Sequence, residues 1–281
     1  MRGSADALRA RVSADLGTRP RRVRSLFVGL GLTNRERNWE NRPVAEQGAD
    51  DPVLLITGAS SGIGAATARA AAGKYRLVLA ARRLEPLEAL VEELGGKERA
   101  LAVRCDVTEW DQVEALAAAG IERFGRIDAV FANAGFGATR GFLEESPEHW
   151  RSMVLTNVYG VALTIRATLP HLLERGEGHF LITSSVAGRR ALPGSLYSAT
   201  KWAATAIGEA LRAELRQMHE NRAIRVTLIE PGMTDTPFFD DRPGEWALRD
   251  DDIAKAVIYA LEQRPGVDVN EILIRPTSQP I

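Results

Sequence analysis

Residues 53–64 read VLLITGASSGIG, an apolar run that passes directly into a glycine-rich turn. The first five residues are typical of a strand buried on both faces of a parallel sheet. Residues 65–72 then read AATARAAA, which strongly favours a helix. A strand, a glycine turn and a helix form a phosphate site, because glycines let a ligand approach the backbone and the helix N-terminus presents amide groups. A glycine-rich turn without a ligand is the alternative, and the flanking strand and helix weigh against it.

A second motif, YSATK, places Tyr197 and Lys201 four residues apart. On a helix these two side chains would share one face, with the ammonium beside the phenol. A free phenol has a pKa of about 10, and a nearby cation lowers that pKa. A lowered pKa would suit general acid/base catalysis at neutral pH. The spacing alone is a weak signal that also fits a surface pair; the glycine turn upstream favours the chemical interpretation.

The motifs and their order resemble the short-chain dehydrogenase/reductase family over about residues 52–281. The ordered pieces are TGASSGIG at 57–64, CDV at 105–107, ANAG at 132–135, TNVYG around Asn157, SSVAG containing Ser185, the YSATK motif, and Pro231-Gly232 followed by Thr236. Residues 270–277, NEILIRPT, resemble a bacterial subgroup of NADP-dependent carbonyl and hydroxy-acid oxidoreductases. The resemblance implies an enzyme that acts on CH–OH and C=O groups.

From residue 52 onward, strand-like and helix-like segments alternate. We predict an α/β fold of the Rossmann type, doubly wound, with a seven-stranded, mostly parallel sheet and helices on both faces in a single domain over residues 52–281. Strands are expected near 53–57, 77–81, 100–104, 129–132, 179–183, 225–229 and 271–274. Helices are expected near 63–73, 84–94, 110–124, 148–174, 197–219 and 250–263. Ligands of such sheets bind at the carboxyl ends of the strands, where the motifs fall.

Residues 1–51 form a different kind of segment. They carry ten arginines and seven acidic residues, a net charge of +3. We interpret them as a poorly ordered or atypical N-terminal extension, or an over-long translation start. A targeting presequence is disfavoured by the acidic residues, and an arm that binds a membrane surface or a partner is the third interpretation.

The end of the second predicted strand indicates the cofactor. Residues 77–83 read LVLAARR, with Arg82 and Arg83 where an acidic residue would bind the 2′-hydroxyl of NAD. Guanidinium groups bind phosphate well, so the sequence favours NADP(H) over NAD(H). The alternative is a solvated arginine pair that opens a helix. Ser61 occupies the family's other basic position, which leaves the preference to the two arginines.

The resemblance also implies the contacts with the cofactor. Asp106 would accept a hydrogen bond from the adenine amino group, unless it is only a turn residue that caps a helix. Thr236 would hold the nicotinamide carboxamide, with Thr234 the weaker candidate. The whole implied set is Gly58, Ser60, Ser61, Gly62, Ile63, Gly64, Arg82, Arg83, Asp106, Val107, Asn133, Ala134, Gly135, Tyr197, Lys201, Pro231, Gly232, Thr234 and Thr236.

The same resemblance implies a mechanism. Tyr197 would give a proton to a substrate carbonyl oxygen, and Lys201 would lower the Tyr197 pKa and bind the nicotinamide ribose. Ser185 would hydrogen-bond the carbonyl oxygen, with Ser184 as its competitor. Asn157 would hold a water that links Lys201 to solvent. The alternatives are an NAD-dependent alcohol dehydrogenase of the same fold and a non-catalytic NADP-binding sensor or scaffold.

The substrate pocket is less well defined. Phe136, Leu192, Pro193 and Phe238 are candidates, and residues 237–249 occupy the usual place of a substrate-covering lid, with Phe239 and Trp246 available to cover apolar surface. These aromatic residues serve packing as readily as recognition. A short lid suggests an open site, and small aldehydes, ketones and 3-hydroxy acids all remain candidate substrates.

Composition narrows the classes of partner and location. The 281 residues have a formal net charge of −1, which gives no reason to expect nucleic acid. A single cysteine, Cys105, suits a reducing compartment, and no apolar run approaches the roughly 18–20 residues of a membrane span. We therefore expect a cytoplasmic protein without stable membrane insertion. The four scattered histidines predict no metal site. The family resemblance implies a homodimer or homotetramer formed through the helices near 110–124, 148–174 and 197–219.

Overall fold

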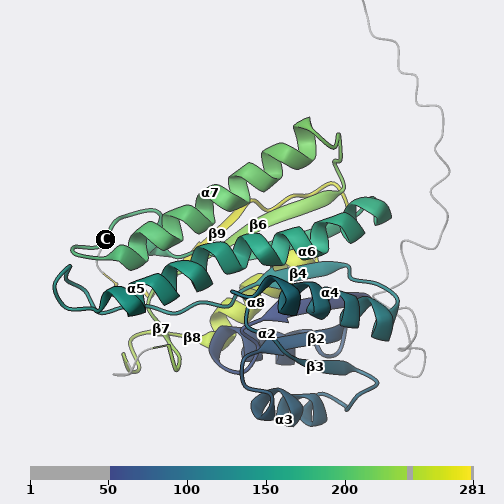
Figure 1. Ribbon diagram of the computed structural model, residues 1–281, viewed down its shortest axis with the longest axis horizontal. Coiled ribbons are helices and arrows are strands. Elements are labelled where there is room, and N and C mark those ends of the chain that lie inside the picture. Colours follow the sequence, from purple (N-terminus) through teal and green to yellow (C-terminus); the bar gives the residue numbers. More distant parts are fainter. Residues whose placement is uncertain (1–50, 239–242, 280–281) are drawn as a thin grey trace, which may run out of the picture. The chain divides into compact units, whose positions relative to one another are not determined.

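The computed structural model describes residues 51–238 and 243–279, in which one seven-stranded sheet dominates (Figure 1). Every neighbouring pair of strands is parallel, which confirms the Rossmann-type prediction. The sheet order reverses between β1 and β4, so two strands end side by side there and open a crevice. The order is β3 (Ala100–Arg104), β2 (Arg76–Ala81), β1 (Val53–Thr57), β4 (Ala129–Ala132), β5 (Gly178–Thr183), β6 (Ile224–Pro231) and β9 (Glu271–Ile274).

Six helices cover the two faces of the sheet. Residues of α2 (Gly62–Ala71), α3 (Glu85–Glu93) and α8 (Asp250–Leu261) belong to one buried apolar cluster. Residues of α4 (Trp110–Phe124), α6 (Gly160–Arg175) and α7 (Leu196–Gln217) belong to the other. Strand β1 contributes Leu54 and Ile56 to the first cluster and Val53 and Leu55 to the second. Because successive strand residues face opposite sides, burial on both sides explains why this strand is apolar throughout.

The single helix predicted near 148–174 is wrong. Helix α5 (Pro147–Val154) is separated from α6 by a π-helical turn, η4 (Leu155–Tyr159). Asn157 lies in this turn, and its side chain bonds to the backbone of Phe136, 21 residues earlier. Turns of this kind frequently lie at functional sites, and this one places the buried Asn157 amide against the segment that follows β4.

Two short strands that the sequence did not predict bracket the expected lid segment. Strand β7 (Thr234–Asp235) pairs with β8 (Leu248–Arg249). Elsewhere, a one-turn helix, η5 (Val186–Gly188), follows β5. Of the candidate lid residues, Phe239 lies outside the described residues. So does the predicted N-terminal extension up to residue 50, and the boundary at residues 51 and 52 stays a prediction.

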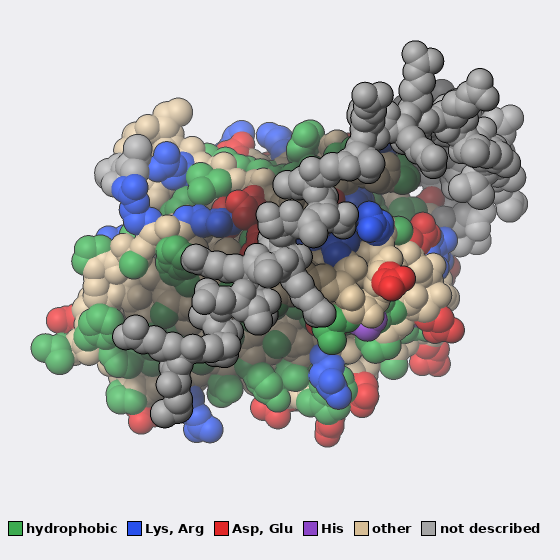
Figure 2. All heavy atoms as spheres, turned by 90° about the horizontal axis from the view of Figure 1, so that it is seen from above, with side chains coloured by type: hydrophobic (Ala, Val, Ile, Leu, Met, Phe, Trp, Pro, Cys, Tyr) green, Lys and Arg blue, Asp and Glu red, His purple; other side chains and the backbone are tan. Residues whose placement is uncertain are grey.

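The described helices include none that is both long enough and apolar enough to cross a membrane. On the face shown in Figure 2, acidic and basic side chains both occur and lie among apolar ones.

The glycine turn is fixed by close backbone contacts. Gly58 has a φ of +69°, and a methyl group on it would lie 2.9 Å from the Cα of Ala134 at the end of β4. A methyl group on Gly64 would lie 2.3 Å from the Gly58 carbonyl oxygen, closer than any real contact. The turn therefore folds back on itself and against β4 only because side chains are missing at both positions.

We expect the Gly64→Ala substitution to lower the free energy of unfolding by about 1–3 kcal/mol, because the added methyl group forces the backbone of the turn to move. Chemical denaturation measures this change. Gly73→Ala is the matched control, since a methyl group there meets nothing within 4 Å; its effect should stay within about 0.5 kcal/mol. Equal stability of the two variants would contradict the close packing of the turn.

Candidate active site

A cavity of about 570 Å³ opens at the carboxyl ends of the strands. This volume lies in the usual range for small-molecule sites, about 300–1,000 Å³. Apart from the lid candidates, three predicted residues do not line the cavity: Gly64 lies beneath the turn, Asn157 is buried beside it, and Pro193 is exposed. The predicted residues that line it are Gly58, Ser60, Ser61, Gly62, Ile63, Arg82, Arg83, Asp106, Val107, Asn133, Ala134, Gly135, Phe136, Ser184, Ser185, Leu192, Tyr197, Lys201, Pro231, Gly232, Thr234, Thr236 and Phe238.

The glycine turn presents the N-terminus of α2 to this cavity. Ser61 is the N-cap residue, and its side chain makes no capping hydrogen bond. The first amide groups of a helix lack intrahelical partners, so this end of α2 can bind an anionic group.

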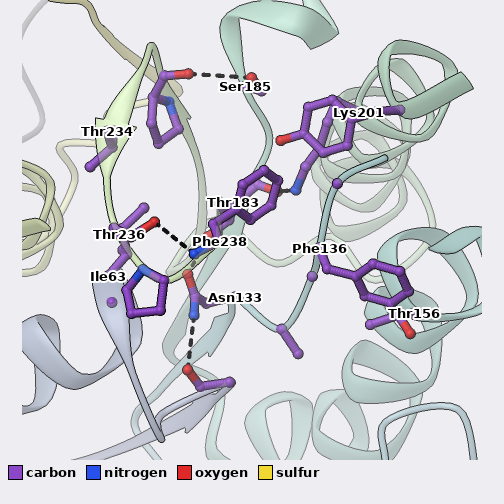
Figure 3. Close-up of a pocket in the computed structure, with 18 of the residues that line it drawn as sticks. Ile63, Asn133, Phe136, Thr156, Thr183, Ser185, Lys201, Thr234, Thr236 and Phe238 are labelled. Carbon is purple, nitrogen blue, oxygen red and sulfur yellow. Dashed lines mark hydrogen bonds between the residues drawn. The ribbon is translucent and has the colours of Figure 1, made fainter. Parts of the chain in front are cut away.

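Asn133 ties together three strands at the floor of the cavity. Its Nδ2 donates to the Thr57 carbonyl oxygen at 3.1 Å, and its backbone amide donates to Thr57 Oγ1 at 3.0 Å. Its Oδ1 accepts a hydrogen bond from Thr183 Oγ1 at 3.0 Å, as Figure 3 shows from the side of the cavity. These bonds hold the ends of β1, β4 and β5 in one arrangement.

Arg82 and Arg83 follow β2 directly and line the cavity at the end opposite Tyr197. Arg104, which no sequence motif indicated, pairs in register with Ala81 and lines a smaller hollow together with Arg82. Asp106 borders both spaces, and its Oδ1 accepts hydrogen bonds from the amide and the hydroxyl of Thr108. Asp106 thus makes the contacts of a turn residue, which was the alternative to an adenine contact. It also lines the cavity.

The two neighbouring serines have different contacts. Ser184 Oγ donates to the Lys201 carbonyl oxygen at 3.0 Å and bonds to Thr205 Oγ1 at 2.7 Å, so its hydroxyl is bound to helix α7. Ser185 is the N-cap of η5: its Oγ accepts from the Ala187 amide and donates to the Pro231 carbonyl oxygen at 3.3 Å. The Pro231 bond is long for a hydroxyl donor and is the easier one to exchange for a ligand. These contacts favour Ser185 over Ser184 as the serine that meets a substrate.

Tyr197 and Lys201 lie in the first two turns of α7, where Ser195 caps the helix by accepting from the Ser198 amide. Lys201 Nζ lies 5.6 Å from the centroid of the Tyr197 ring and donates to the Thr183 carbonyl oxygen at 2.9 Å. Figure 3 shows Lys201 reaching toward Thr183. Tyr197 and Lys201 therefore share one face of α7, as predicted.

The predicted direction of the Tyr197 pKa shift is wrong for the protein alone. Burial raises the pKa of Tyr197 to about 12, and a hydrogen bond with Ser185 opposes that rise. Burial also lowers the pKa of Lys201 to about 8. Removal from water disfavours the charged form of each group, and the ammonium faces the Thr183 carbonyl oxygen. The spacing of the two residues predicted their proximity but not their burial.

Asn157 uses its amide group to hold the segment that follows β4. Its Oδ1 accepts from the Phe136 amide at 3.0 Å, and its Nδ2 donates to the Phe136 carbonyl oxygen and to Thr200 Oγ1. A methyl group on Gly135 would lie 3.0 Å from Asn157 Oδ1 and 3.6 Å from Lys201 Nζ. The residue thus links the end of β4 to α7, and its expected role in holding a water stays a prediction.

Of the predicted substrate pocket residues, Phe238 contacts Tyr197, and Phe136 and Leu192 line the same cavity. The Phe238 ring meets the Tyr197 ring edge-on at 5.7 Å between centroids, and it packs where a methyl group on Gly137 would lie 2.8 Å away. Phe136 packs edge-on against His149 at 5.3 Å, and the Leu192 amide donates to Ser198 Oγ. Trp246 is not among the lining residues. The sequence offered no signal for several other residues that line the cavity: Ala138, Arg140, Thr156, Ser195, Met233 and Gln279.

Comparison with known proteins agrees with this arrangement. The short chain dehydrogenase family model matches residues 52–245. An uncharacterised oxidoreductase of Listeria monocytogenes is 40% identical over 243 residues, which cover 81% of this chain and 97% of that protein.

Two solved structures are similar as well. An alcohol dehydrogenase of the archaeon Thermococcus sibiricus, complexed with 5-hydroxy-NADP, is 35% identical with a TM-score of 0.75, and the match covers 83% of this chain and 99% of that one. A 3-ketoacyl-(acyl-carrier-protein) reductase of Brucella melitensis, complexed with NADH, is 30% identical with a TM-score of 0.72, covering 80% and 97%. With its parallel sheet, its glycine turn and these relatives, the chain belongs to the short-chain dehydrogenase/reductase family of oxidoreductases.

Proposed function

We propose that this protein is an NADP(H)-dependent oxidoreductase that transfers a hydride between the nicotinamide and a small carbonyl or alcohol substrate. The observation that carries the proposal is one continuous cavity. It runs from the glycine turn and the Arg82–Arg83 pair to Ser185, Tyr197 and Lys201. A nucleotide site and an acid/base group therefore share one space, as a nucleotide-dependent reaction requires.

The residues of this cavity suit a dinucleotide. The uncapped N-terminus of α2 would hold the pyrophosphate, and Asp106 with Val107 would border the adenine. Residues 133–135 would line the nucleotide path, and the segment from Pro231 to Thr236 would hold the carboxamide. The nicotinamide supplies or accepts the hydride.

The preference for NADP(H) rests on charge. Arg82, Arg83 and Arg104 follow or end the two strands that lie beside the expected adenosine, and residues 77–83 hold no carboxylate that would favour NAD(H). The solved relatives do not decide between the cofactors, because the Thermococcus structure is complexed with an NADP analogue and the Brucella structure with NADH.

The chain's own residues supply the proton chemistry. In reduction the Tyr197 hydroxyl donates its proton to the substrate oxygen, and in oxidation the phenolate accepts it. Ser185 Oγ donates to the same oxygen and supports the charge that develops there. Lys201 stabilises the tyrosinate left after proton donation and binds the ribose hydroxyls. Phe136, Leu192 and Phe238 exclude water from the reacting carbonyl.

We also propose a homo-oligomer in the cytoplasm. Helices α5 to α7 expose large apolar side chains that are costly to leave in water, among them Val154 at 39%, Tyr159 at 47% and Trp202 at 48% exposure. These residues lie on the helices for which the family resemblance implied subunit contacts.

We expect Tyr197→Phe to lower turnover by about 10²–10⁴-fold, because it removes the proton donor, while NADPH affinity falls by a much smaller factor. Turnover is followed as NADPH oxidation with a panel of small aldehydes, ketones and 3-oxo acids, and affinity by NADPH fluorescence. Tyr259→Phe is the matched control, since Tyr259 is 57% exposed on α8. Tight NADPH binding by the wild type without turnover of any substrate would favour the sensor or scaffold alternative.

The raised pKa of Tyr197 predicts little phenolate at pH 10, where an ordinary tyrosine is half ionised. The tyrosinate absorbance of the wild type minus that of Tyr197→Phe isolates this group during an alkaline titration without nucleotide. Added NADP⁺ should move the titration to lower pH, because a positive charge nearby favours the phenolate. A midpoint below pH 10 without nucleotide would mean that Lys201 outweighs burial.

We expect Arg82→Ala to weaken NADPH binding by about 10–100-fold, the usual worth of a charge-assisted hydrogen bond, and to leave NADH binding unchanged. Fluorescence titration with each nucleotide measures the two affinities. Arg151→Ala on α5 serves as the control, because Arg151 is exposed and does not line the cavity. A wild-type preference for NADH at equal concentration would instead support the NAD-dependent alternative.

A further inference from the structure

An ion pair between a buried carboxylate and a partly exposed arginine lies beside the candidate active site without lining it. Glu230 is only 1% exposed, and Arg189 Nε donates to its Oε1 at 2.7 Å. Arg189 also pairs with Glu271 at the start of β9. Neither Arg189 nor Glu230 is among the residues that line the cavity, so the proposed reaction gives this pair no direct part.

The arginine is attached rigidly to Ser185. The turn η5 begins with Ser185 as its N-cap and ends with Arg189 as its C-cap. Inside it the Gly188 amide donates to the Ser185 carbonyl oxygen at 2.8 Å, and the Arg189 amide donates to the Val186 carbonyl oxygen at 3.1 Å. A single hydrogen-bonded turn therefore separates the two side chains, and a shift at one end is passed to the other.

The partner residues of this turn are also adjacent. Ser185 Oγ bonds to the carbonyl oxygen of Pro231, and Arg189 bonds to the carboxylate of Glu230, the preceding residue of β6. Two side-chain bonds therefore join the two ends of one turn to two consecutive residues of one strand. Figure 3 shows the Ser185 bond at the edge of the cavity.

The two bonds differ in strength. The Ser185 bond, at 3.3 Å between neutral groups, is weak, whereas the Arg189 bond is short, charge-assisted and made to a buried carboxylate. An unpaired buried charge is strongly destabilising, so Glu230 holds Arg189 in place. The Ser184 amide also donates to the Ile229 carbonyl oxygen at 2.8 Å, so the start of the turn is bonded to β6 by the backbone and its end by the ion pair. Ser185 can therefore exchange Pro231 for a substrate oxygen without losing its position.

We propose that Arg189 is a positioning residue for Ser185, and that its ion pair with Glu230 keeps the serine hydroxyl aimed into the cavity. The inference rests on the proposed function, because it assumes that Ser185 meets the substrate oxygen. Small misplacements of a group that contacts the reacting atoms are costly in rate. The ion pair therefore affects kcat through Ser185 and not through the fold as a whole.

A double-mutant cycle on kcat tests this directly, using Arg189→Met, Ser185→Ala and the combination in the NADPH-dependent assay. We expect Arg189→Met to lower kcat by about tenfold in the wild type, a coupling typical of residues that act together. In the Ser185→Ala background it should change kcat by less than about twofold, because the group it positions is already gone. Arg189→Lys, which keeps the charge, should recover part of the loss.

Arg216→Met is the matched control. Arg216 pairs with Asp268 at 3.0 Å and is 30% exposed, against 32% for Arg189, and it lies at the far end of α7. We expect this variant to lower the melting temperature, and any loss of kcat it causes should be the same factor with and without Ser185→Ala.

Two results would overturn the inference: an unchanged kcat in Arg189→Met, or an equal loss of kcat in both backgrounds. If Arg189→Met does not fold, Arg189→Lys takes its place in the same cycle and is judged by the same criterion. A wild type that reduces no carbonyl with either nucleotide would remove the proposed function, and this inference with it. If the wild type is active, and Ser185→Ala lowers its kcat but Arg189→Met does not, the inference is overturned and the proposed function stands.

Discussion

The close approach between the turn after β1 and the end of β4 is the constraint on which the site depends. Gly58 and Ala134 pack with no room for a side chain on the glycine, and Asn133 bonds across the same gap to the Thr57 carbonyl oxygen. The sheet order reverses between these strands, so a crevice is inevitable there. Because glycines line this crevice, its walls consist of backbone and amide groups, and a phosphate can come close to them.

Two buried charges then fix the remaining wall. Lys201, on α7, donates to the Thr183 carbonyl oxygen, and Glu230, on β6, accepts from Arg189. A buried charge that loses its partner is expensive, so neither side chain can move independently of its partner. The segment that holds Ser184 and Ser185 runs between them, bonded to α7 through Ser184 and to β6 through Ser185. The end of the cavity at Ser185 and Lys201 is thus held rigidly from two sides.

Local pattern was enough to predict the seven strands of the large sheet and most helices, because buried parallel strands are apolar. Most of the predicted residues around the cavity came instead from the ordered motifs of the family resemblance. Local pattern failed where a contact between residues far apart in the sequence determines the local structure. Nothing local interrupts a helix at residues 155–159; the interruption accompanies bonds from Asn157 to Phe136, 21 residues away. The spacing of Tyr197 and Lys201 predicted that the two side chains share one face of a helix. It could not predict that Lys201 bonds to a carbonyl 18 residues earlier, or that the two groups are buried.

That burial determines the protonation states of Tyr197 and Lys201. With the pKa of Tyr197 near 12 and that of Lys201 near 8, both groups carry their protons at neutral pH. A protonated phenol is the form that gives a proton to a carbonyl, whereas alcohol oxidation needs the phenolate, which burial disfavours. The ammonium of Lys201, held 5.6 Å from the ring centroid, stabilises the phenolate mainly after the proton has left. In the protein alone Tyr197 is therefore held in its phenol form, and a further positive charge beside it would offset its desolvation and favour the phenolate.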